Sequence, residues 1–203
     1  MIENTWQILS GDDYIKAVQA VNSAFDNERF SIKSSIIQVR ELPFYKNFKL
    51  LKAIEANAYP RCSMNFLYDN ENIIKLDYSA APITRANKES PIELNLTNLS
   101  EYLKFFFSAI RNKEGDNFYF VEKFSDIPLQ PNYNDELESE LSNILTPVNA
   151  RVKDDGDFDA KAFIIHQNEL ILAQLNISRN GFVSVLEENT VMADLPIQKN
   201  MLK

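Results

Sequence analysis

The sequence has few of the residue types on which cofactor and metal sites depend. Its 203 residues include one cysteine, one histidine and four glycines. The glycines stand apart from one another, so they form neither a phosphate-binding loop nor a dinucleotide fingerprint. One cysteine and one histidine are too few for a structural zinc site, which takes four such ligands. We therefore expect no cofactor.

Long apolar runs and a second cysteine are also missing. Cys62 has no partner for an intrachain disulfide, which favours a reducing compartment. No run approaches the roughly 18 apolar residues of a membrane helix. The first residues lack the basic and apolar regions of a signal peptide. From these features we expect a cytoplasmic protein with no membrane association.

Acidic residues outnumber basic ones, 29 to 21, which gives a formal net charge of −8. A negative surface is repelled by phosphate backbones, so we expect no nucleic-acid partner. The hydrophobic content of 45% is typical of globular proteins, and the chain is long enough to bury a sizeable core.

The strongest helical pattern lies in residues 99–110. On a helix its apolar side chains cover an arc of roughly 200°, which predicts an element covered on more than one side. We therefore place this Phe-rich helix at the centre of the fold. Phe107, at the edge of the arc, is the candidate for contact with a cavity or a partner chain.

In the first half, the spacing predicts a helix over residues 12–25, with Ser10 and Asp13 as a capping box. Residues 30–39 are β-branched and apolar enough for one or two strands, and 62–78 alternate as a hairpin does. Residues 44–58 fit a helix or a strand, and their neighbours favour a strand.

In the second half, we expect a polar loop over residues 84–90, between Pro82 and Pro91, before Asn98 caps the central helix. A strand follows over 118–124, and Pro128 and Pro131 mark a segment like a linker. A short helix then precedes four strands of a meander, at about 148–153, 158–166, 169–177 and 182–187.

Together these elements predict an α+β fold with antiparallel sheets, a central Phe-rich helix and a four-stranded C-terminal meander. We expect a single domain over residues 1–196 and a frayed tail over 197–203. The alternative is two subdomains, 1–127 and 132–196.

Three residues are candidates for catalysis. Cys62 and His166 form the one thiol–imidazole pair that the chain allows, but the alternation around Cys62 favours a small inward-facing core residue. Asp77 ends the first hairpin beside a loop, where sites are common, although a charge on an edge strand also discourages aggregation.

Asp155, Asp157 and Asp159 stand at alternate positions, as in the first half of a calcium loop. Ala160 and His166 occupy the places of the required glycine and glutamate. An acidic hairpin turn is therefore the favoured interpretation, and these three residues stay the only metal candidates.

Without catalytic motifs, the sequence favours a non-catalytic binding or interaction protein, such as an adaptor, a chaperone-like factor or a regulator. The expected partner is another protein or a second copy of the chain, as a dimer. The alternatives are a cofactor-independent enzyme, most simply a hydrolase, and a sensor that binds a small apolar ligand beside the Phe-rich helix.

Overall fold

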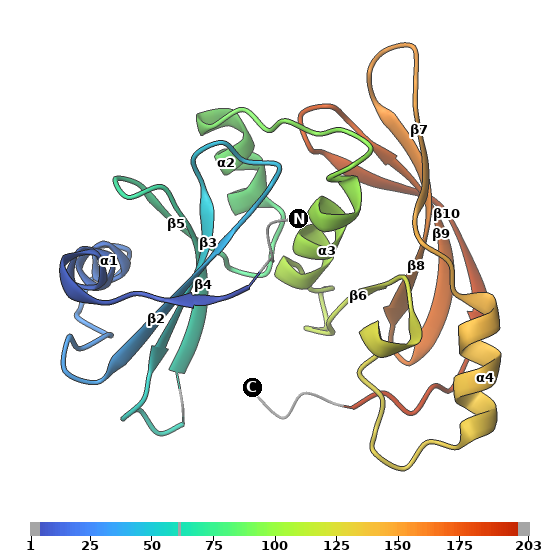
Figure 1. Cartoon of the computed structure of the whole chain (residues 1–203), viewed down its shortest axis with the longest axis horizontal. Helices are drawn as coiled ribbons and strands as arrows, with labels where there is room; N and C mark the ends of the chain where they lie inside the picture. The colour runs from blue at the N-terminus through green and yellow to red at the C-terminus, as the bar shows by residue number, and fades with distance from the viewer. Residues whose placement is uncertain (1–4, 61, 199–203) are drawn as a thin grey trace. The chain divides into compact units, whose positions relative to one another are not determined.

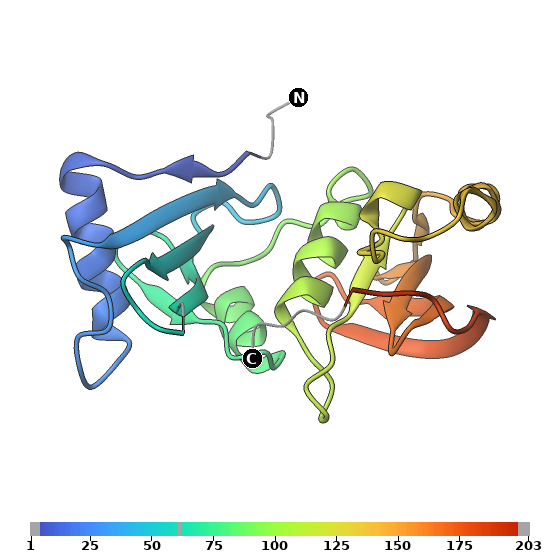
Figure 2. The same cartoon turned by 90° about the horizontal axis from the view of Figure 1, so that it is seen from below.

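The computed structural model of the chain describes residues 5–60 and 62–198, and it has the predicted α+β fold with two antiparallel sheets (Figures 1 and 2). The chain divides into two compact units, Met1–Glu93 and Leu94–Lys203. Within the described ranges, no helix is both long and apolar enough to cross a membrane.

The first unit is built on a five-stranded antiparallel sheet whose strands follow one another in sequence order. One face is covered by helix α1 (Gly11–Ser23), which buries Ala17, Val18 and Val21 there. The α1 helix and the 62–78 hairpin were predicted, and the ambiguous 44–58 segment forms a strand. The strands are β1 (Gln7–Ile8), β2 (Ser35–Glu41), β3 (Lys49–Glu55), β4 (Cys62–Tyr68) and β5 (Ile73–Lys75).

The predicted polar loop at 84–90 is wrong, because helix α2 spans Ala81–Glu89. Pro82 lies in its first turn, where a missing N–H leaves no hydrogen bond unmade. The helix also buries Pro82, Ile83 and Ala86, a short apolar stripe among polar residues. The sequence pattern places Pro82 at the border of a loop, whereas it lies in the first turn of a helix.

Helix caps were also assigned incorrectly from the sequence. Ser10 and Asn98 stand at the N-cap positions of their helices, but neither side chain makes a cap hydrogen bond. Instead, the side chain of Asn98 accepts the N–H of Asn95, on the preceding turn. Asn134 does cap its helix, by accepting the N–H of Leu137 at 2.9 Å.

The second unit holds a sheet of order β10-β9-β8-β6, with β7 pairing with another part of β8. The expected C-terminal meander is present, and its last strand runs beyond the predicted end. The elements are α3 (Leu99–Ala109), β6 (Tyr119–Val121), the 3-10 helix η1 (Phe124–Asp126), α4 (Asp135–Ile144), β7 (Asn149–Val152), β8 (Phe158–His166), β9 (Glu169–Ile177) and β10 (Val183–Met192).

Alternating residues of β6 direct the packing on the two faces of this sheet. Phe120 stacks on Phe107 of α3, with ring centroids 6.3 Å apart, whereas the next residue, Val121, joins the core beneath α4. Phe107 is only 3% exposed, so the residue that we expected to face a cavity or partner lies in the core.

The Pro128–Pro131 segment lies within the second unit, where its backbone bonds to Pro196 and Gln198. Gln130 N–H donates to the carbonyl of Pro196 at 2.8 Å, and Ile197 is buried. The two compact units divide after Glu93, while the single domain and the alternative of two subdomains both stay predictions. Of the expected frayed tail, residues 199–203 lie outside the described residues.

Candidate functional site

Cys62 begins β4 and packs, half-buried, against the core of the first unit. Its register partner on β3 is Glu55. Directly opposite residues on antiparallel strands share a face of the sheet, so the thiol lies on the side of an acidic group. These surroundings fit a small core residue.

Glu55 is a buried carboxylate that the sequence reasoning missed, and it is 8% exposed. Its Oε2 accepts the N–H of Ser31 at 2.9 Å and the hydroxyl of Ser35 at 2.7 Å. The hydroxyl of Ser34 is the largest cause that lowers the pKa of Glu55 to about 2, ahead of the opposing effect of burial. This carboxylate therefore fixes the 31–35 segment as a structural group.

Tyr14 of α1 also bonds to the 31–35 segment. Its hydroxyl donates to the carbonyls of Ser35 at 2.8 Å and Ile32 at 3.0 Å. Burial, together with the charge of Glu55, raises the pKa of Tyr14, which keeps it a donor. Because these groups satisfy one another, the cluster supports the fold without offering a free acid or base.

Asp77 forms a local turn ahead of α2. Its Oδ1 accepts the hydroxyl of Ser79 at 2.7 Å and the N–H of Ser79 at 3.0 Å. These two bonds are the largest causes that lower the pKa of Asp77. An ionised aspartate that bonds two residues ahead is typical of an Asx turn, so the geometry gives Asp77 a structural role.

His166 ends β8, where its ring stacks on Phe118 with centroids 4.5 Å apart. Its Nε2 lies 2.9 Å from the side-chain nitrogen of Asn112. The oxygen of that amide accepts the N–H of Asp116, so its nitrogen is the donor to His166. The ring must therefore accept at Nε2, which places the proton of the neutral ring on Nδ1.

The Cys62–His166 pair stays a prediction. Cys62 belongs to the first unit, and the ring of His166 contacts Phe118 and Asn112 of the second.

The three carboxylates of the metal candidate each have a separate partner. Oδ2 of Asp159 pairs with Arg151 at 2.9 Å, and Oδ1 of Asp157 accepts the N–H of Arg179 at 3.0 Å. Asp155 bonds the N–H of Asp157, the largest cause that lowers the pKa of Asp155. Among the described residues, no three His, Cys, Asp or Glu side chains gather as a metal site would require.

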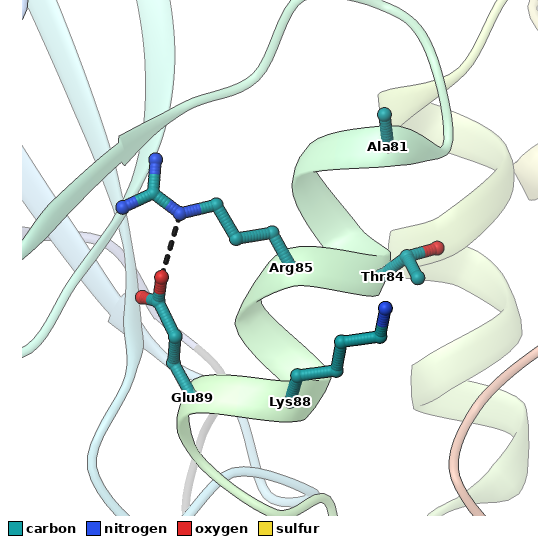
Figure 3. Close-up of a pocket in the computed structure, with 5 residues that line it drawn as sticks. All are labelled: Ala81, Thr84, Arg85, Lys88 and Glu89. Carbon is teal, nitrogen blue, oxygen red and sulfur yellow. Dashed lines mark hydrogen bonds and ion pairs between the residues drawn. The ribbon is translucent and has the colours of Figure 1, made fainter.

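An open hollow lies along α2, lined by Ala81, Thr84, Arg85, Lys88 and Glu89 (Figure 3). Arg85 and Glu89 form an ion pair of 2.6 Å. The hydroxyl of Thr84 donates to the carbonyl of Ala80, one turn back. With its one carboxylate paired to Arg85, the lining offers no nucleophile beside a general base, and the hollow makes a poor catalytic site.

The exposed edge of β10 is the feature of the second unit best suited to binding. This strand stands at the end of its sheet, and β9 is the only strand in the described ranges that pairs with it. Val185, Leu186 and Val191 on β10 are 44%, 57% and 40% exposed. A ten-residue edge offers a row of unpaired backbone groups to an incoming strand.

Most of the negative charge of the chain belongs to the same unit. Residues 1–93 contain 12 acidic and 11 basic residues, whereas 94–203 contain 17 and 10. Four of the acidic residues, Asp135, Glu136, Glu138 and Glu140, lie exposed on α4. Most of the net negative charge of the protein therefore comes from the second unit, which also carries the exposed edge of β10.

Neither protein-family models, nor curated proteins, nor solved structures give a significant match to this chain. The arrangement of its own residues therefore carries the functional argument.

Proposed function

We propose that this protein is a non-catalytic binding protein that docks a partner chain on the edge of β10. The single observation behind the proposal is a ten-residue edge strand whose residues from Val185 to Val191 are all exposed. Large apolar side chains are among them, although water solvates them poorly. A partner strand covers these side chains and pairs the backbone groups of the edge in one step.

The bonding of the candidate catalytic groups supports the same proposal. Oδ1 of Asp77 accepts two hydrogen bonds from Ser79, and Nε2 of His166 accepts a hydrogen bond from Asn112. Cys62 packs against the core. Catalysis needs groups that are free to exchange protons or to attack a substrate, and these groups hold the fold instead.

Site-specific photo-crosslinking tests the proposal. A photoreactive residue replaces Asn189, which is exposed on β10, and in a matched chain it replaces Lys161, which is exposed on β8 of the same sheet. In cells that express the full chain, we expect an adduct of defined mass from position 189 and none from position 161. No adduct at 189, or equal adducts at both positions, would overturn a docking role for the edge.

A further inference from the structure

We infer that the segment bound by β10 is an extended peptide with lysine or arginine at its centre and apolar residues on both sides. This inference rests on the proposed function and adds the chemistry of the partner. Its basis is the order of side chains along the edge. Exposed Val185 and Leu186 precede Glu187 and Glu188, and exposed Val191 follows.

Two irregularities in the pairing with β9 mark the ends of this pattern. The register skips Leu186, between Val185 and Glu187, and skips Val191, between Thr190 and Met192. A bulged residue leaves the regular alternation of the strand, and the ladder bends there. The bulges therefore exclude a long flat partner and leave a short regular stretch, Glu187–Thr190, with an apolar side chain at either end.

The two glutamates argue against a second copy of the chain as the occupant. An antiparallel self-pairing centred on them would place Glu187 opposite Glu188, and like charges opposite one another destabilise a sheet. The excess of acidic residues in this unit adds to the repulsion. Lysine or arginine at the centre of the partner segment is attracted both to the two glutamates and to the acidic unit as a whole, and this attraction speeds association.

The length of the partner segment follows from strand geometry. Leu186 and Val191 are five residues apart, which corresponds to about 16 Å of extended chain. A peptide of about six residues spans that distance. In an antiparallel pairing with residues 186–191, the matching probe has the sequence Val-Thr-Thr-Lys-Arg-Val, which places its lysine opposite Glu188 and its arginine opposite Glu187. The control peptide has Glu-Glu in place of Lys-Arg.

Fluorescence anisotropy with the full chain and labelled peptides provides the test. We expect the basic probe to bind at least tenfold more tightly than the acidic control, with an affinity that falls as salt rises. Replacing both edge glutamates, Glu187→Lys with Glu188→Lys, should reverse the preference. Replacing two exposed glutamates of α4, Glu136→Lys with Glu138→Lys, makes the same change of charge in the same unit and should leave the preference intact.

Three results would overturn the inference: no binding of the basic probe, no preference between the peptides, or an equal loss in both double variants. A concentration-dependent dimer in light scattering that the β10 variant abolishes would also overturn it, and would assign the edge to a second copy. If the adduct at position 189 forms while the basic probe fails, the docking role stands and only the partner chemistry is wrong.

Discussion

The two units build similar antiparallel sheets but leave different edges. The sheet of the first unit ends in strands of two and three residues, β1 and β5. Short terminal strands are a common protection against unwanted pairing. The second unit ends its sheet with β10, ten residues long and apolar in part. Because of this contrast, we place the proposed binding surface on the second unit.

Each unit holds one carboxylate that is shielded from solvent, the buried Glu55 and the partly buried Glu122, and the two are stabilised differently. Glu55 of the first unit is held by hydroxyl and backbone N–H groups. In the second unit, burial alone would raise the pKa of Glu122, but bonds from Lys104 at 2.7 Å, the N–H of Val148 and Ser100 hold that pKa below its usual range. Glu55 is stabilised by neutral hydrogen-bond donors, whereas Glu122 is stabilised in part by the charge of Lys104. Acid should therefore destabilise the first unit by protonating Glu55 and the second by protonating Glu122.

The largest expected effect comes from the core of the first unit. Phe66 is fully buried and meets Phe25 edge to face, so Phe66→Ala should lower the free energy of unfolding by about 3–5 kcal/mol.

The chain has one tryptophan, Trp6 in the first unit, and one histidine, His166 in the second, so each unit has its own spectroscopic probe. We expect the thermal transition seen by Trp6 fluorescence to shift, while that of the His166 NMR signals does not. A common shift would mean that the units unfold as the single domain predicted from the sequence.

A smaller effect is expected from the dipole-held carboxylate. Glu55→Gln removes charge-assisted hydrogen bonds and should cost about 2–3 kcal/mol at neutral pH. The pKa of Glu55 falls from an ordinary 4.5 to about 2 on folding, so the ionised group stabilises the native state above pH 4.5. That stability is lost as the pH falls from 4.5 towards 2. Urea unfolding of the variant should therefore depend less on pH in this window.

Glu41→Gln is the matched control for that experiment. Glu41 lies on the neighbouring strand β2 and forms an exposed ion pair with Lys49 at 2.8 Å. Such pairs contribute little, so this variant should change stability by less than about 1 kcal/mol. If both variants lose the same free energy of unfolding, the buried carboxylate of Glu55 does not stabilise the fold more than an exposed one.

The smallest effect is spectroscopic and concerns the second unit. Because His166 is the only histidine, its ring nitrogens can be assigned directly by ¹⁵N NMR. At a pH where the ring is neutral, we expect the proton on Nδ1, and Asn112→Ala should shift the population towards Nε2. The opposite tautomer in the wild-type chain would show that Asn112 does not orient the ring.

Elements with a clear period were predictable from the sequence. The apolar spacing of α1 and the alternation of β4 and β5 both reflect local preferences of the chain. Helix α2 was missed because a proline in a first turn resembles a breaker when its packing is unknown. The sequence placed Ser10 and Asn98 correctly at helix starts, but it did not predict their hydrogen bonds. The type of an N-cap residue indicates where a helix begins, whereas the partner of its side chain depends on the local geometry.

The candidate site depended on contacts between distant residues. Glu55 and Ser31 are 24 positions apart, and nothing in the sequence around either predicts their bond. Asp155, Asp157 and Asp159 looked alike in sequence, yet each found a different partner, because register and turn geometry decide which cation or N–H lies within reach.

The sequence by itself determined the α+β class, the Phe-rich helix α3 and the acidic balance, because composition and periodicity are carried by residues close together in the chain. Only the tertiary structure decided that α3 buries Phe107 and that β10 lies at an edge with its glutamates exposed. The order of strands in a sheet depends on pairing between distant segments, and an edge exists only when no other strand occupies it.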